Sequence, residues 1–94
     1  MIKIEGYEIW RDGTKIGYIQ GDRIRGHDGK ILGSFSGNYV YNVQGHKIAY
    51  IEGDYLCSES ATAAKVYLDK VNESITGGLL PEIGKCAIFV LIGA

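Results

Sequence analysis

Small, turn-forming residues and aliphatic residues recur every 16 positions through the first 57 residues of the chain. Gly21, Gly37 and Gly53 each begin a unit, and each is followed three positions later by an aliphatic side chain, at Ile24, Val40 and Leu56. A first copy, one residue shorter, opens at Gly6 and carries Ile9. Self-similarity at a fixed period indicates that one small structural unit is repeated.

Each unit contains two turn signals about eight residues apart. Asp-Gly or Gln-Gly lies in the middle, and Gly-Asp or Gly-Asn lies at the join. Glycine in the first central position of a two-residue loop is typical of a type II′ turn, and Asp-Gly is typical of type I′. The intervening segments are rich in β-branched and aromatic residues and contain no proline. We therefore predict about eight short strands between Ile2 and Cys57, in up-and-down antiparallel order.

The aliphatic side chains near the end of each unit are three positions apart, so a flat strand would point them to opposite faces. A small residue lies inside every pair, which permits a bulge that returns both side chains to one interior. The three pairs, each with its small residue, are Ile16 and Ile19 with Gly17, Leu32 and Phe35 with Gly33, and Ile48 and Ile51 with Ala49. The expected fold is mainly β: four tandem 16-residue β-hairpin repeats with pseudo-four-fold symmetry, in a closed or strongly curled antiparallel meander. A flatter meander with two apolar faces is the alternative.

The repeat ends at Cys57, and the pattern changes. Apolar side chains at spacings of three and four predict an amphipathic helix over residues 58–76, before Gly77-Gly78. Residues 79–94 are predicted to be an extended apolar segment, because Pro81 disfavours helix before it. Within that segment Cys86–Ile92 is predicted to be a final apolar strand, which fills the core or meets a second copy of the chain.

Length and charge restrict the class of protein. Ninety-four residues support one core, so residues 1–94 are predicted to form a single domain. The net charge of −1 gives no field for a polyanion, which argues against nucleic acid as a partner. No apolar run reaches the roughly 20 residues of a membrane span, and no secretory signal is recognised at Met1, so a cytoplasmic location is expected. The two cysteines are expected to be buried thiols.

The units Gly21–Ser36 and Gly37–Glu52 resemble the tandem GxxIxxxxGxxIGYIxG units of bacterial proteins described as four-fold β-flower domains. The resemblance covers roughly residues 6–57. It implies four hairpin petals around a pseudo-four-fold axis and brings no activity, cofactor or catalytic residue. The short first unit, Gly26-His27 before Asp28-Gly29, and the added helix depart from that pattern. A PRC-barrel-like domain is the second resemblance, through the Asp-Gly-x-x-Ile-Gly segments.

Few residues point to catalysis. His27 and His46 lie at or near turns, where a solvated histidine is the ordinary outcome. Asp22, Asn38 and Asp54 are repeat equivalents that symmetry would place on one rim, but turns prefer these residues for their own reasons. No phosphate-binding glycine motif is present. We therefore expect no enzyme, no cofactor and no metal site, with a small enzyme of unknown type as the last alternative.

Aromatic residues at equivalent repeat positions are the strongest indication of binding, because rigid amphipathic rings anchor partners at interfaces. Cross-strand pairs that stabilise the hairpins are the other interpretation. The expected function is a non-catalytic module for self-association, as a homo-oligomer, or for binding another protein; a small-ligand or glycan-binding module is the alternative. The possible recognition surface comprises Tyr7, Trp10, Tyr39, Tyr41 and Tyr55, and the possible assembly surface comprises Tyr67, Val71, Ile88, Val90 and Ile92.

Overall fold

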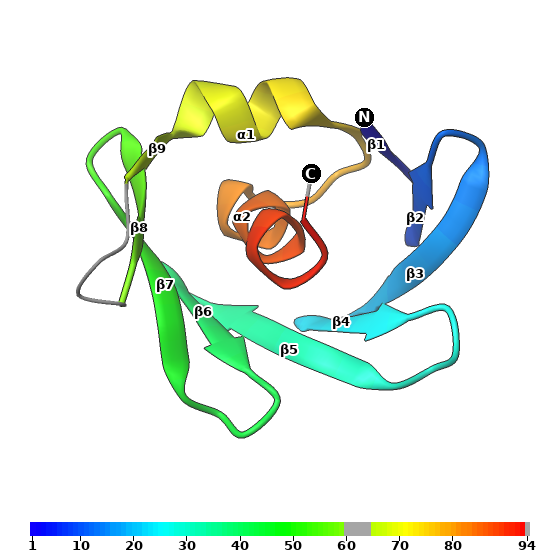
Figure 1. Cartoon of the computed structure of the whole chain (residues 1–94), viewed down its shortest axis with the longest axis horizontal. Helices are drawn as coiled ribbons and strands as arrows, with labels where there is room; N and C mark the ends of the chain where they lie inside the picture. The colour runs from blue at the N-terminus through cyan, green and yellow to red at the C-terminus, as the bar shows by residue number, and fades with distance from the viewer. Residues whose placement is uncertain (60–64, 94) are drawn as a thin grey trace.

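The computed structural model describes residues 1–59 and 65–93 and shows a strongly curled sheet that surrounds one helix (Figure 1). Eight strands cover the repeat region, as the turn signals predict: β1 (Ile2–Glu5), β2 (Glu8–Arg11), β3 (Thr14–Gln20), β4 (Arg23–Gly26), β5 (Ile31–Ser36), β6 (Tyr39–Asn42), β7 (Lys47–Glu52) and β8 (Tyr55–Ser58). Four further elements follow: β9 (Val66–Tyr67), α1 (Leu68–Ser74), β10 (Ile75–Gly77) and α2 (Glu82–Leu91).

The strands form one sheet in the order β10-β1-β2-β3-β4-β5-β6-β7-β8-β9. Neighbours are antiparallel except β1 and β10, which pair in parallel. Among the described residues no pairing joins β9 to β10, and α1 spans that gap (Figure 1). The mainly β class and the strongly curled meander are thus confirmed, whereas the closed form is wrong. The pseudo-four-fold symmetry stays a prediction.

The curl follows from a bulge that recurs at the predicted place. The pairing register shifts between Ile9 and Trp10, between Ile24 and Arg25, and between Val40 and Tyr41. At each shift one aliphatic residue of the facing strand is left out of the pairing register. The three residues left out are Ile16, Leu32 and Ile48. Each packs against the core, as does the apolar residue three positions later. A bulge bends its strand and increases the local twist, so equal intervals give continuous curvature.

Turn geometry agrees with the sequence at the join Gly21-Asp22 and at Asp12-Gly13, and it differs at Asp28-Gly29. Gly21 has a φ of 60° while Asp22 keeps a negative φ, as a type II′ turn requires. Asp12 and Gly13 both have positive φ, 50° and 82°, as in type I′. The same prediction for Asp28-Gly29 is wrong: only Gly29 has positive φ there, within the longer loop 27–30 between β4 and β5.

The predicted helix over residues 58–76 is only partly correct. α1 spans Leu68–Ser74, and strands β9 and β10 occupy the positions immediately before and after it. Ser58, the first residue of the expected helix start, belongs to β8, and residues 60–64 lie outside the described residues. Pairing of residues 66–67 with β8 and of residues 75–77 with β1 extends the sheet at both edges and outweighs helix continuation.

The extended segment predicted over residues 79–94, with its final apolar strand at Cys86–Ile92, is wrong. Residues Glu82–Leu91 form α2, which begins after Pro81 and carries Glu82 in its first turn. Figure 1 shows α2 enclosed by the sheet. A short run that is apolar on every side suits a buried helix as well as a buried strand, so periodicity did not distinguish the two.

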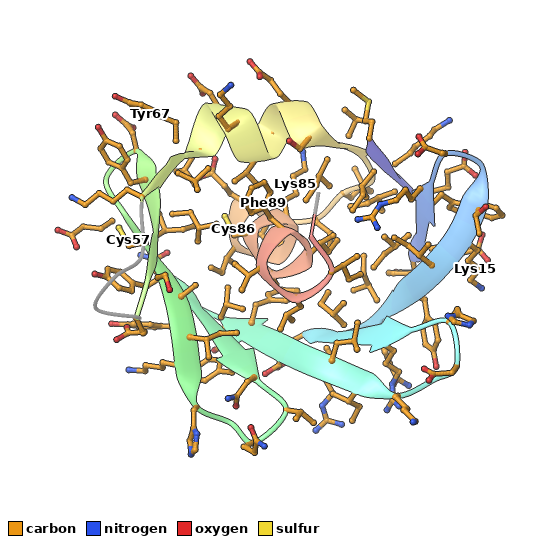
Figure 2. All side chains as sticks on the ribbon, viewed as in Figure 1. Lys15, Cys57, Tyr67, Lys85, Cys86 and Phe89 are labelled. Carbon is orange, nitrogen blue, oxygen red and sulfur yellow. The ribbon has the colours of Figure 1, made fainter. Side chains whose placement is uncertain are left out.

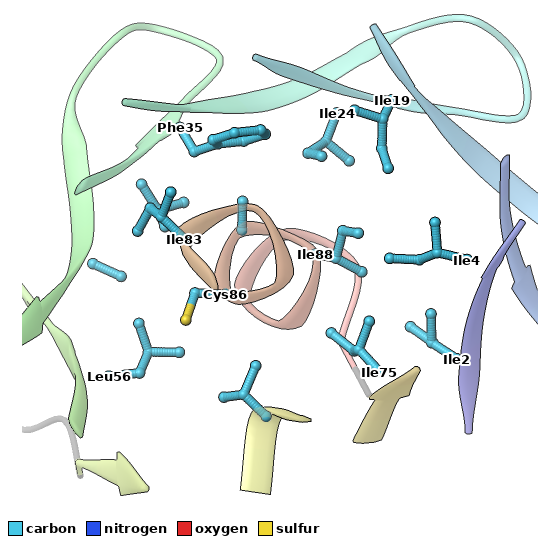
Figure 3. Packing of buried hydrophobic residues seen from close by; sticks show 14 of the residues in the cluster. Ile2, Ile4, Ile19, Ile24, Phe35, Leu56, Ile75, Ile83, Cys86 and Ile88 are labelled. Carbon is cyan, nitrogen blue, oxygen red and sulfur yellow. The ribbon is translucent and has the colours of Figure 1, made fainter. Parts of the chain in front are cut away.

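Aliphatic side chains from the sheet and both helices form one buried cluster. The repeat equivalents Ile9, Ile24, Val40 and Leu56 all belong to it, as their shared position predicts. Cys86, Ala87 and Ile88 of α2 are fully buried among them, and Figure 3 shows side chains from opposite sides of the sheet pointing toward this helix. No polar or charged side chain in the described part of the chain is buried. No described helix is long and apolar enough to cross a bilayer.

Candidate functional site

Tyrosines from four consecutive strands gather on the outer side of the curled sheet. β6 carries two of them, while β7, β8 and β9 carry one each; they are Tyr39, Tyr41, Tyr50, Tyr55 and Tyr67, here called the tyrosine face. Successive side chains of a strand alternate between faces. Because Val40, Ala49 and Leu56 point into the core, their neighbours in sequence point outward.

Strand register brings the rings of β6 and β7 together. Tyr39 is directly opposite Tyr50, and their ring centroids are 6.5 Å apart at an interplanar angle of 43°. Tyr41, two residues along β6, has its ring centroid 6.4 Å from that of Tyr39, at 50°. These separations lie in the range of attractive aromatic pairs. The three rings therefore form one connected cluster.

A second pair extends the tyrosine face onto β8 and β9. Tyr55 is opposite Tyr67, with ring centroids 4.6 Å apart. The Tyr55 hydroxyl donates a hydrogen bond of 3.0 Å to the Tyr67 hydroxyl oxygen. This bond is the main cause of the raised pKa of Tyr55, to which the charge of Asp54 adds a smaller contribution. Tyr67 is 56% exposed, and Figure 2 shows it on the outside of the sheet.

Lysine ammonium groups already lie over rings of this face. The Lys47 Nζ is 3.9 Å from the centroid of the Tyr39 ring, and the Lys65 Nζ is 5.3 Å from that of Tyr55. Both distances are within the range of cation–π attraction. The exposed faces of these rings thus accept cations.

Carboxylates and a thiol complete the surroundings of Tyr50. Cys57 is opposite Tyr50 and is buried, and the Cys57 thiol is the first cause of the raised pKa of Tyr50. Partial desolvation and the charges of Glu52 and Glu59 raise that pKa further. Glu52 and Glu59 are both exposed. Glu52 and Glu59 are therefore the sources of negative charge near the Tyr50 hydroxyl.

Tyr7 and Trp10, the other two members of the predicted recognition surface, lie away from this face. Tyr7 is in the turn between β1 and β2, 75% exposed, beside a hollow of about 490 Å³ that Leu79 and Leu80 also line. Trp10 lines a separate hollow of about 330 Å³ together with Lys3 and Asp12. The predicted surface is thus divided: Tyr39, Tyr41 and Tyr55 belong to the tyrosine face, and the remaining two do not.

The Trp10 side of the sheet has its own polar contacts. Lys15 Nζ forms an ion pair of 3.0 Å with Glu8, and this contact lowers the pKa of Glu8. The Trp10 indole N–H makes a smaller contribution to the lowered pKa of Glu8, although it forms no hydrogen bond with any acceptor in the described part of the chain. No described residue that lines this hollow is a nucleophile beside a base.

The predicted assembly surface is not a surface at two of its five positions. Val71 on α1 and Ile88 on α2 are fully buried inside the chain, because both helices turn these side chains toward the core. Ile92 is half-buried and Val90 is 37% exposed. Tyr67, at 56%, is the most exposed of the five residues, and it belongs to the tyrosine face.

Two tyrosines of the face were missing from the predicted recognition surface. Tyr50 is the repeat equivalent of Tyr18 and lies outside the predicted recognition surface, and Tyr67 belongs to the predicted assembly surface. The register beside the bulge at Val40 and Tyr41 places Tyr50 opposite Tyr39. The pairing of Tyr67 with Tyr55 had no signal in the sequence, because β9 has only two residues.

The histidines belong to loops and not to the strands of the tyrosine face. His27 and His46 are both exposed in loops. Within residues 1–59 and 65–93, no group of three or more His, Cys, Asp or Glu side chains is arranged to hold a metal ion. No protein-family model, no curated protein and no solved structure matches the chain.

Proposed function

We propose that the protein is a non-catalytic interaction module that binds a partner protein through the tyrosine face. The observation that supports this is the gathering of five tyrosines from β6, β7, β8 and β9 on one outer surface, in two groups of contacting rings. Tyrosine combines a large apolar ring with a hydroxyl and loses little conformational entropy, which is why it is enriched at binding hot spots.

Stabilisation of the hairpins explains part of this arrangement, since a cross-strand aromatic pair contributes roughly 0.2–1 kcal/mol. It does not require the exposed ring area of Tyr39 and Tyr67, which are 37% and 56% exposed. Apolar side chains gain nothing from surface left in water. The exposed ring area is therefore the observation that favours partner binding over hairpin stabilisation alone.

A protein partner suits this face better than a glycan does. The ring of Tyr39 is tilted by 50° from Tyr41 and by 43° from Tyr50. These rings therefore share no plane on which a flat sugar could stack, whereas the side chains of a protein can enter between tilted rings. The apolar segment Cys86–Ile92 was the main reason to expect self-association. Most of this segment belongs to helix α2, which the sheet encloses, so it offers little surface to a second copy of the chain.

Selection from a library of random peptides displayed on phage tests the proposal. Tyr50→Ser alters the centre of the face, and Tyr18→Ser is the matched control, because Tyr18 has the equivalent repeat position on β3. Circular dichroism and thermal unfolding establish that both variants fold. We expect selected peptides to bind the wild type and Tyr18→Ser but to lose at least tenfold in affinity for Tyr50→Ser. Peptides that bind all three proteins equally, or a selection without enrichment, contradict the proposal.

A further inference from the structure

We infer that the tyrosine face recognises an extended, arginine-bearing segment of its partner, with arginines at alternate positions. This inference rests on the proposed function and adds the chemical class of the ligand. It depends on three features of the described residues: the use of ring faces by cations, the sign of charge around the face, and the spacing of the rings.

Ring faces on this surface already act as cation sites. Lys47 lies 3.9 Å from the Tyr39 centroid, and Lys65 lies 5.3 Å from that of Tyr55. A guanidinium is planar and more weakly hydrated than an ammonium, so it stacks on an aromatic ring at a lower desolvation penalty. Arginine from a partner therefore competes well for positions that the chain fills with its own lysines.

Acidic side chains border the same rings. Glu52 lies on β7 opposite Tyr55, Asp54 lies in the turn just before Tyr55, and Glu59 directly follows β8. All three are exposed. Their charges add to the raised pKa of Tyr50 or of Tyr55, after the larger effects of Cys57 on Tyr50 and of the Tyr67 hydrogen bond on Tyr55.

The strands of the tyrosine face carry a small excess of negative charge. Residues 39–67, which include β6–β9, contain three acidic residues and two lysines. An acidic, tyrosine-rich surface complements a cationic partner and repels an anionic one such as nucleic acid.

The ring spacing matches an extended peptide. Tyr39 has neighbouring ring centroids at 6.4 Å and 6.5 Å. Side chains on one side of an extended chain are two residues, or roughly 6.6 Å, apart. Because Tyr39 and Tyr41 both lie on β6, two arginines at alternate positions of a segment that runs along this strand would meet their two rings, while Glu52 on β7 lies within the same surface to neutralise a guanidinium.

Titrations of the full chain with defined peptides test the inference. The probe is acetyl-Gly-Arg-Gly-Arg-Gly-Arg-Gly-amide, and amide chemical shifts in two-dimensional NMR report the site and the affinity. We expect shifts to concentrate on β6–β9. Lysine in place of every arginine should weaken binding by about threefold, and glutamine in its place by at least about tenfold, as the loss of cation–π and ionic attraction implies. A peptide with the three arginines adjacent should bind less tightly than the alternating probe.

Variants of the protein separate the contribution of the acidic side chains to arginine binding from that of the tyrosine rings. Glu52→Gln should weaken arginine binding by about three- to fivefold, whereas Glu5→Gln, which alters an exposed acid of β1 on another part of the sheet, should leave it unchanged. Lys47→Ala should strengthen binding by about twofold or more, because it frees the Tyr39 ring. An unchanged or weaker affinity in Lys47→Ala contradicts the use of that ring.

The two proposals fail in different ways. If library peptides bind through Tyr50 but the arginine and glutamine probes bind alike, the charge inference is wrong and the interaction module stands. If the arginine probe shifts only residues of β1–β3, the inference is also wrong. If neither the library nor the probes reach β6–β9, the proposed function itself is wrong.

Discussion

A methyl group at position 33 should destabilise the fold through two specific contacts. Gly33 pairs with Ile24 on one side and Asn42 on the other, at the bulge of its unit. A Cβ there would lie 2.7 Å and 2.8 Å from the two terminal carbons of Leu91 on α2 and closer still to the carbonyl oxygen of Tyr41. The φ of Gly33 lies outside the left-handed region, so alanine suits the backbone itself. The expected effect of Gly33→Ala is therefore steric.

The magnitude follows from overpacking. One extra methyl in a packed core costs typically about 1–3 kcal/mol. Replacing glycine also restricts the unfolded chain, which offsets about 0.4–1 kcal/mol of that loss. The Tyr41 carbonyl belongs to the paired backbone of β6 and has little freedom to move, so the upper part of the steric range applies. We expect Gly33→Ala to lower the free energy of unfolding by about 2 kcal/mol, or Tm by roughly 8–16 °C.

Urea titration followed by circular dichroism measures the effect. Ala49 is the matched control position, because it pairs with Val40 and Ser58 in the corresponding place and already carries the methyl. Ala49→Gly should lower stability by about 1 kcal/mol, through lost burial and added freedom of the unfolded chain. Part of the Gly33→Ala loss should be recovered in a Leu91→Ala background, because the α2 contact is then absent. A loss below about 0.5 kcal/mol for Gly33→Ala would refute the reasoning.

Three further predictions concern α2 and the tyrosine face. Ile88→Ala should cost about 2–5 kcal/mol in urea titration, whereas the 37% exposed Val90→Ala should cost less than about 1 kcal/mol; similar losses would indicate a strand, in which both residues share one face. Burial and, less strongly, the nearby Glu82 raise the pKa of the Cys86 thiol to about 12, so a chain in which it is the sole cysteine should react with Ellman's reagent at pH 8 no faster than it unfolds. Fast labelling in the folded state would contradict that burial. Tyr67→Phe should lower the pKa of Tyr55, because the hydrogen bond favours the protonated phenol. Because the pKa of Tyr55 is raised in the folded state, this group contributes stability that is fully present below its unfolded-state pKa and is lost as pH rises through its folded-state pKa. Tyr67→Phe lacks this contribution, so above pH ~10 it should lose less stability than the wild type does. Carbon-13 NMR of the ring follows this titration, and an unchanged pKa would count against the bond.

The candidate site followed from the sequence only in part. The repeat identified aromatic residues at equivalent positions, whereas the register in which Tyr39 faces Tyr50 comes from the structure. The predicted recognition surface groups Tyr7 with Tyr39 and Tyr55, but Tyr7 follows Gly6 by one residue, whereas Tyr39 and Tyr55 follow the glycines of their units by two. Tyr7 therefore has the turn position, and the structure places it in a turn away from the tyrosine face. The contribution of Tyr67 depends on the pairing of β9 with β8, a contact between segments separated by a break in the repeat.

The sequence by itself determined the eight repeat strands, their joining turns and the bulges that curl the sheet. These features depend on which residues tolerate positive φ and on the alternation of side chains, and both are local properties. The tertiary structure decided the conformation of residues 82–91. Enclosed by the sheet, a strand would leave backbone N–H and C=O groups without partners, since the surrounding strands already pair with one another. A helix satisfies those groups within itself and presents apolar side chains in every direction, so the interior selects α2 where the apolar run alone allowed either form.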